Sequence, residues 1–459
     1  SSGTSTLSTP ISDSGTYGFG GLTKLGGGTL AITTANTYTG YTQMLGGTLE
    51  IGNDAALSTN AVIWNSGTIR ADSTARTLAN TFYLQGNLTV AGAQDLTFTG
   101  SMTNIADSNR TLTISNTGLT TFGDIVITGS PTSNQLTRSL TINGAGTALI
   151  NGVISDGLFA DGRLIRNTGT GTLILAGANT YTGGTTINAG TVQLGNGGTS
   201  GSILGNVTVG ANGTLAFNRS DASAFHGDIS GAGRITHLGA GTTMLDGTHA
   251  YSGTTSVQNG TLIVNGSIAT STLTTISHGA TLGGSGAIGN LELAGILAPG
   301  NSPGTLNAGN TLWLGGASYN WEINNAYGTA GTNWDLLNIT GTLTIAATAH
   351  DPFIIELISL LGDNSAGALT NFDAALDYSY IIATASEGIS GFNADAFAIS
   401  TSGFANDLLG GNWSVSLQGN SLSLDFNAFS AVPEPSTYAA IFGALVLAFA
   451  AWCKRRSAG

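Results

Sequence analysis

Apolar and polar side chains alternate along most of this chain in short runs that end at Gly or Asn. Between Thr185 and Leu194, for example, the apolar residues Ile187, Val192 and Leu194 are separated by small or polar residues. A period of two over a few residues, closed by turn-forming residues, predicts short β-strands joined by tight turns. Before the extreme C-terminus no stretch carries an apolar stripe with helical spacing, so we expect no crossover helices and no βαβ sheet.

This pattern is itself repeated. Three segments align with one another without a gap, at residues 28–53, 171–196 and 241–266. Each is preceded by a related lead-in that begins Ile-Ser-Asp or Ile-Ser-Gly, at residues 11–13, 154–156 and 229–231. Repetition on this scale indicates a solenoid, in which each unit buries its apolar face against its neighbours.

We therefore predict an all-β fold, a right-handed parallel β-helix over residues 1–345. Each coil would hydrogen-bond to the coils above and below it, at about 4.8 Å per coil, with equivalent side chains stacked in ladders. The residues expected to point inward in the three copies are Ile32, Met44, Leu49, Ile51, Leu175, Ile187, Val192, Leu194, Leu245, Val257, Leu262 and Val264.

Two further positions recur in all three copies. Glycines stand where the coil must turn, and a positive φ is often required at such corners; they are Gly40, Gly183 and Gly253. Tyrosines precede them by two residues, at Tyr38, Tyr181 and Tyr251. The tyrosines have two interpretations, an exposed aromatic row that binds sugar or structural corner residues, and the β-favouring Thr-Tyr-Thr context supports the second.

The second copy reads N-T-Y-T-G-G-T-T followed by A-G-T-V-Q-L-G. It resembles the autotransporter-associated β-strand repeat of exported bacterial β-helix proteins. Residues 297–306, with 321–323 and 334–341, resemble the closing section of the same group. The resemblance implies an exported structural or adhesive protein of the cell surface or extracellular matrix.

From about residue 346 the chain changes character. Leu, Ile, Phe and Tyr become commoner and the repeat signal fades. Because the open end of a solenoid must be covered, we expect residues 346–430 to form a β-rich terminal cap with room for one short helix.

Composition limits the chemistry available. Only 8% of the 459 residues are charged, against about 25% in ordinary domains, while Gly accounts for 70 residues. The formal net charge of -13 would repel nucleic acid, so no nucleic-acid partner is expected. The single cysteine, Cys453, excludes an intrachain disulfide.

Motifs that suggest catalysis or metal binding lack their supporting context. Residues 300–304 match G-x-S-x-G, but Pro303 cannot supply the backbone N–H that an oxyanion hole needs. Residues 284–289 match G-x-G-x-x-G, yet another strand follows in place of a helix. The five histidines have no metal-ligand spacing, so we predict no catalytic, cofactor-binding or metal-binding residues and no cofactor; they are His226, His237, His249, His278 and His350.

The alternative is a β-helix enzyme that binds or degrades polysaccharide. Such lyases and glycosidases use clustered acidic and basic residues on one face. One cluster of this kind occurs, formed by Asp156, Asp161, Arg163 and Arg166. A solvated turn explains the same four residues, and we expect a non-enzymatic protein.

The C-terminal residues form the sole membrane-span candidate. An uncharged apolar run at 437–453 precedes the basic cluster Lys454, Arg455 and Arg456 within residues 454–459. We predict one C-terminal transmembrane helix at 437–453 in the inner membrane, with the basic tail cytoplasmic and the β-rich body outside.

Residues 431–436 contain Val-Pro-Glu-Pro directly before this run. Together with the helix and basic cluster they resemble the PEP-CTERM sorting signal of Gram-negative bacteria that make extracellular polysaccharide. The resemblance implies recognition of Pro433, Glu434 and Pro435 by an exosortase-type protease in the inner membrane. It implies a protein anchored there transiently before release to the cell surface, in association with exopolysaccharide or biofilm.

Overall fold

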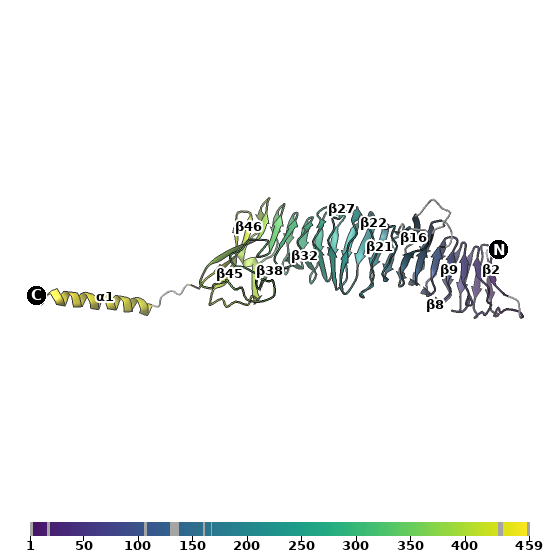
Figure 1. Ribbon diagram of the computed structural model, residues 1–459, viewed down its shortest axis with the longest axis horizontal. Helices are drawn as coiled ribbons and strands as arrows, with labels where there is room; N and C mark the ends of the chain where they lie inside the picture. Colours follow the sequence, from purple (N-terminus) through teal and green to yellow (C-terminus); the bar gives the residue numbers. More distant parts are fainter. Residues whose placement is uncertain are drawn as a thin grey trace.

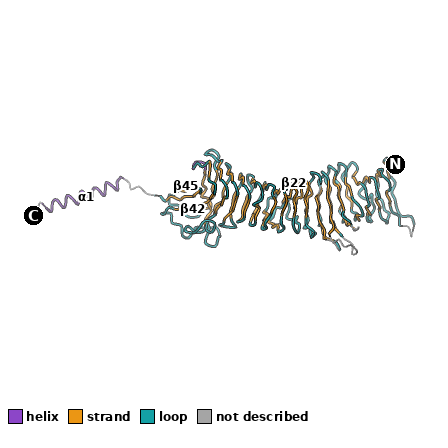
Figure 2. The backbone as a smooth tube through the Cα atoms, turned by 90° about the horizontal axis from the view of Figure 1, so that it is seen from above, coloured by secondary structure: helices purple, strands orange, loops and turns teal. Residues whose placement is uncertain are grey.

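The computed structural model describes residues 3–15, 19–104, 108–128, 137–158, 161–166, 168–429 and 435–456. The protein is a parallel β-solenoid of about 14 turns, and Figure 1 shows its coils stacked along one long axis. The view from above in Figure 2 shows short strands joined by loops along the stack of coils. The predicted parallel β-helix is confirmed.

The largest sheet runs the length of the solenoid. In its N-terminal half the strands are β1 (Thr4–Leu7), β3 (Thr29–Ile32), β5 (Thr48–Ile51), β7 (Thr68–Ala71), β8 (Arg76–Leu78), β10 (Leu88–Val90), β11 (Leu96–Phe98), β13 (Arg110–Ile114), β14 (Thr120–Phe122), β16 (Thr137–Asn143), β17 (Ala148–Ile150), β19 (Asp161–Arg166) and β20 (Thr172–Leu175). In its C-terminal half they are β21 (Thr185–Leu194), β22 (Val207–Phe217), β24 (Ile229–Gly231), β25 (Arg234–His237), β27 (Ala250–Tyr251), β28 (Thr255–Val257), β31 (Thr274–Ile276), β34 (Leu291–Leu293), β37 (Thr311–Trp313), β40 (Leu343–Ile345) and β43 (Ile389–Ser390).

Three shorter sheets form the remaining faces. The N-terminal one contains β2 (Leu22–Lys24), β4 (Thr42–Met44), β6 (Val62–Trp64), β9 (Phe82–Leu84), β12 (Met102–Asn104), β15 (Ile125–Ile127) and β18 (Ile154–Asp156). A C-terminal one contains β23 (Ala222–Phe225), β26 (Thr242–Leu245), β29 (Thr261–Val264), β32 (Thr281–Gly284), β35 (Ile296–Pro299), β38 (Ser318–Ile323), β41 (Phe353–Ser359) and β44 (Phe397–Gly403). The other contains β30 (Ser267–Ile268), β33 (Ala287–Ile288), β36 (Thr305–Ala308), β39 (Leu336–Ile339), β42 (Tyr378–Ala385), β46 (Ser421–Asn427) and β45 (Asn412–Gln418).

Strand register places apolar side chains of successive coils on top of one another. Leu49 pairs with Ile69, and Leu262 pairs with Leu282. Alternate residues of these strands point inward, because successive side chains of a strand face opposite sides. All twelve residues predicted to point inward in the three copies belong to the continuous buried core.

The corner glycines are required for a reason other than the one predicted. Gly40, Gly183 and Gly253 do not have a positive φ. A Cβ on Gly183 would lie 2.6 Å from the Gly162 carbonyl oxygen of the preceding coil, and one on Gly253 would lie 1.9 Å from the Gly233 oxygen. Close approach of two backbones therefore selects glycine at these corners.

Parallel pairing continues beyond residue 345, where the sequence analysis placed the end of the β-helix. β41 pairs in parallel with β38, and β44 pairs in parallel with β41. The alternation of buried Phe353, Ile355 and Leu357 sustains the coil although the Gly- and Thr-rich repeat has ended. Among the strands of the described residues, antiparallel pairing occurs where β46 joins β42 and β45, whereas earlier antiparallel contacts are isolated bridges such as that between Gly284 and Gly300. The short helix η1 (Ala394–Ala396) lies within this closing region.

The last described residues form α1 (Pro435–Arg456), which lies beyond the end of the solenoid in Figure 1. Among the residues that the structure describes, no helix has both the length and the apolar character needed to cross a membrane. The prediction of a transmembrane helix at 437–453 is therefore not supported.

Candidate functional site

The repeated tyrosines occupy one structural position in three coils. All three side chains are fully buried. The Tyr181 hydroxyl shares a hydrogen bond with Thr185 Oγ1 at 2.7 Å, and the Tyr38–Thr42 and Tyr251–Thr255 pairs do so at 2.5 Å. Burial raises the pKa of each phenol, that of Tyr251 to about 12. The interpretation as an exposed sugar-binding row is wrong, and the corner interpretation is confirmed.

A buried acceptor two residues before each tyrosine joins the repeat to its own lead-in. Ile11 N donates to Asn36 Oδ1 at 2.7 Å, and Ile154 N donates to Asn179 Oδ1 at 2.8 Å. In the third copy the acceptor is His249, whose Nδ1 lies 3.2 Å from Ile229 N.

On the outside of the same corner, the aspartate of the lead-in accepts hydrogen bonds that join the lead-in to the repeat. Asp156 Oδ1 accepts from Gly162 N at 2.6 Å, while its Oδ2 accepts from Thr182 N at 3.0 Å and from Thr182 Oγ1 at 2.6 Å. Asp13 makes the same three contacts with Gly20 and Thr39. The Thr39 hydroxyl, with the backbone N–H groups, lowers the pKa of Asp13.

A buried basic residue closes the next turn in all three copies, a feature that was not predicted from the sequence. Lys24 Nζ donates to the carbonyls of Leu25, Gly26 and Gly46 at 2.8–3.0 Å. His237 Nε2 lies 3.2 Å from the Gly241 carbonyl. The Arg166 guanidinium, 1% exposed, donates to the carbonyls of Ile142, Gly144, Thr168 and Gly171.

The signal for these buried bases was present in the strand alternation. Lys24 has the same parity as Leu22, and Arg166 the same parity as Leu164, so both must point inward in a β-strand. Charge alone suggested solvent exposure. Burial lowers the pKa of Arg166, because desolvation disfavours its charged form.

The four residues of the enzyme alternative do not form a catalytic cluster. Asp156 is engaged in the hydrogen bonds of the corner, and Arg166 points into the coil. Asp161 and Arg163 are exposed on the outward side of β19, and Arg163 Nε donates to the Gly183 carbonyl at 3.4 Å. The alternation of β19 thus separates Arg166 from the two exposed side chains.

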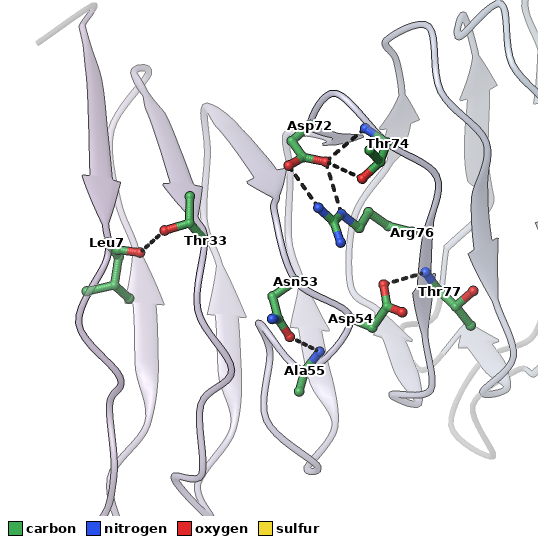
Figure 3. A network of polar contacts seen from close by, with 9 residues as sticks. All are labelled: Leu7, Thr33, Asn53, Asp54, Ala55, Asp72, Thr74, Arg76 and Thr77. Atoms are coloured by element: carbon green, nitrogen blue, oxygen red, sulfur yellow. Dashed lines mark hydrogen bonds and ion pairs between the residues drawn. The ribbon is translucent and has the colours of Figure 1, made fainter.

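Other acidic groups on the outer surface also bind turns. In Figure 3, Asp72 accepts from Arg76 and from Thr74, and Asp54 accepts from Thr77 N at 3.1 Å. The Arg76 side chain holds the pKa of Asp72 below its usual value. No group of three or more His, Cys, Asp and Glu residues placed to hold a metal ion occurs in the described part of the chain.

The G-x-S-x-G match forms a turn fastened by a buried carboxyl. Asp335, fully buried, accepts from Gly304 N at 2.8 Å and from Glu322 N at 3.0 Å. Burial raises the pKa of Asp335 well above its usual value. This loop is thus packed into the coil through its backbone.

Of the predicted sorting residues, Pro433 and Glu434 lie outside the described residues, and Pro435 is the first residue of α1. Lys454, Arg455 and Arg456 are exposed in the last turn of α1. The Arg456 guanidinium lies over the Trp452 ring, 4.4 Å from its centroid.

Comparison with known proteins identifies the repeats. The family described as "Passenger-associated-transport-repeat" matches residues 22–51, 166–194 and 235–264, so the predicted autotransporter-associated repeats are confirmed. The chain is also 35% identical over 189 residues to a protein named "Adhesin BmaC autotransporter" from Brucella suis biovar 1 (strain 1330). That alignment covers 40% of this chain but only 5% of the Brucella protein. Neither comparison bears on the PEP-CTERM signal, which stays a prediction.

Proposed function

We propose that this protein is an exported, cell-surface adhesive β-solenoid that acts through its shape and its outer face. The proposal rests on one observation: the three passenger-associated transport repeats all lie within one continuous parallel solenoid. Such a body is long and presents rows of outward side chains, which suits attachment to an extended surface. The similarity to a named adhesin supports the same function.

A non-enzymatic role is also favoured by the polar residues. Of the four residues that would serve a polysaccharide lyase or glycosidase, Asp156 is engaged in hydrogen bonds at the corner and Arg166 points into the coil. Asp161 and Arg163 lie on the outward side of β19, so the four side chains do not share one face.

Bead adhesion tests this function directly. Beads coated with the full chain should adhere to bacterial cells or to their extracellular matrix more than beads coated with an unrelated acidic protein. The Asp161→Asn and Arg163→Gln variant should adhere as the wild type does. Equal adhesion of both bead types would contradict an adhesive function, and polysaccharide turnover that this variant loses would favour the enzyme.

We also propose that Pro433, Glu434 and Pro435 direct sorting of the protein by an exosortase-type protease. The support is the order of the three elements along the chain, Val-Pro-Glu-Pro, then the apolar residues of α1, then Lys454 to Arg456. Mass spectrometry of protein from the cell surface should find chains that end near residues 432–435. Recovery there of an intact peptide containing Trp452 to Arg456 would contradict cleavage.

A further inference from the structure

The first copy of the repeat exposes two aromatic rings at its corner. Phe19 is 85% exposed and Tyr41 is 55% exposed. They flank the contact between two coils, where Gly40 N donates to the Gly20 carbonyl at 2.7 Å. Gly183 N and the Gly162 carbonyl make the same contact in the second copy, also at 2.7 Å. The backbone of this corner is therefore shared, and its outer side chains can be compared directly.

The fold does not require these rings. The positions of Phe19, Gly21 and Tyr41 are occupied in the second copy by Asp161, Arg163 and Gly184, and in the third copy by Ala232, Arg234 and Thr254. Charged, small and aromatic side chains thus stand on the same corner. Exposed aromatic residues that do not support the fold are typical of a binding surface.

The two rings line a hollow with a bare backbone floor. It has a volume of about 550 Å³, within the usual range for a small-molecule site. Gly21 and Gly40 line it between the rings, and a Cβ on Gly21 would lie 2.8 Å from the Tyr41 carbonyl oxygen. The missing Cβ of Gly21 thus reflects close packing of two coils, and the two glycines add no side chain to the lining of the hollow.

Polar groups border the hollow. Gln43 lies on the outward side of β4, in register between Thr23 and Ile63, and all three line the hollow. Asn60 Nδ2 donates to the Thr39 carbonyl at 2.6 Å, which fixes that edge. An amide such as that of Gln43 offers both donors and an acceptor to a ligand hydroxyl.

The charges select the class of ligand. None of the described residues that line the hollow is charged. The Asp13 carboxylate accepts hydrogen bonds from Gly20 N and from Thr39, which lines the hollow, and the formal net charge of the chain is -13. An anionic glycan would be repelled. A neutral pyranose fits, because its C–H face can stack on the electron-rich face of an aromatic ring while its hydroxyls meet the amides.

We propose that this hollow binds a neutral hexopyranose unit of a surface or matrix glycan. The inference rests on the proposed adhesive function and names its ligand class. Phe19 and Tyr41 supply the stacking faces, Gln43 and Thr23 supply hydrogen bonds, and Asp13 excludes uronic acids.

Affinity electrophoresis of the full chain tests the site. Native gels would contain one of three neutral glycans, hydroxyethylcellulose, laminarin or galactomannan, or the anionic polygalacturonate. We expect at least one neutral glycan to retard the wild type and polygalacturonate not to do so. The Phe19→Ala and Tyr41→Thr variant should bind the neutral glycan about tenfold more weakly or worse. Phe429→Ala, which removes another exposed ring, is the matched control and should not change retardation.

The third copy provides a gain-of-function test. Ala232→Phe, Arg234→Gly, Thr254→Tyr and Ser256→Gln would give the equivalent corner the residues found at Phe19, Gly21, Tyr41 and Gln43, and this variant should be retarded more than the wild type. Absence of retardation by all three neutral glycans, unchanged retardation of the Phe19 and Tyr41 variant, or no gain from the graft would each overturn the proposal. If the Phe19 and Tyr41 variant still adheres in the bead test, this hollow is not the adhesive site. The adhesive function would then still hold, through another part of the surface.

Discussion

At each of the three tyrosine corners, one hydrogen bond between two hydroxyl groups joins the corner residue to the strand that follows it. In the second copy both partners are almost fully buried, Tyr181 at 0% and Thr185 at 3% exposure. A buried polar group that loses its partner costs more than the bond itself contributes.

Tyr181→Phe should therefore lower the local free energy of opening by about 1–2 kcal/mol, because the Thr185 hydroxyl would stay buried without its partner. Hydrogen exchange of amides in residues 171–196 measures this opening. The double variant Tyr181→Phe with Thr185→Val removes both hydroxyls and should cost less than the sum of the single changes. Strictly additive costs would show that the pair is not coupled.

His249 introduces pH dependence at a position where the other copies have asparagine. Its Nδ1 must be unprotonated to accept from Ile229 N. Burial lowers its pKa, and the Asp228 and Asp246 carboxylates oppose that shift without cancelling it. Below the unfolded-state pKa of about 6.5 the unfolded chain binds more protons than the folded one, so stability is lost as pH falls. Burial lowers the pKa of His237 in the same direction.

Amides around Ile229 should accordingly lose protection against hydrogen exchange between about pH 7.5 and about pH 5.5, after correction for the intrinsic rate. His249→Asn should reduce this loss, since Asn36 and Asn179 accept from the equivalent N–H groups without titrating. The remaining pH dependence would come from groups such as His237. An undiminished acid loss in the His249→Asn variant would contradict this role for the imidazole.

At this scale the sequence predicted the inward apolar residues correctly, because strict alternation leaves only one face for them. That Lys24, Arg166 and His237 are also inward was not predicted. Strand alternation placed them inward, but their charge suggested exposure. The carbonyls that they satisfy lie partly in the same turn, as Gly241 does for His237, and partly in another coil, as Ile142 does for Arg166.

At the scale of the element, a turn between two strands depends on one buried base. The Arg166 guanidinium donates four hydrogen bonds to backbone carbonyls of two coils, and none of these four acceptors is a carboxylate. A turn carbonyl buried without a donor is costly, so the guanidinium fixes the path of the chain.

Arg166→Met should lower the local free energy of opening around residues 142–171 by about 2–4 kcal/mol, because four carbonyls lose their donor. Arg166→Lys should lose less, since Lys24 makes three such bonds at the same position of the first copy. Peptide-level hydrogen exchange separates this region from the rest. An equal effect of the two substitutions would mean that the donors do not matter.

The positions of the corner glycines were predicted correctly from the sequence, but the physical reason for glycine at these positions was not. The glycine at a corner and the carbonyl that would meet its Cβ lie in different coils, as for Gly183 and Gly162. Their distance depends on how the coils stack, whereas a positive φ is a local property.

At the scale of the whole molecule, the repeats make each coil a near copy of its neighbour, and function then depends on what each coil displays. Parallel pairing persists through β44 although the recognisable repeat ends earlier, because β-pairing needs only alternation and a matching register. The antiparallel joining of β42, β46 and β45 could not be predicted, since no local pattern in the chain specifies which edge a late strand joins.

The central claim is that this elongated body acts at the cell surface as an adhesin. The most direct measurement uses the organism that produces it, with the gene for the chain deleted and then restored. An antibody against the solenoid should label intact restored cells, and those cells should be retained under flow on native matrix more than deletion cells. Failure to label intact cells, or equal retention of deleted and restored strains, would contradict the account.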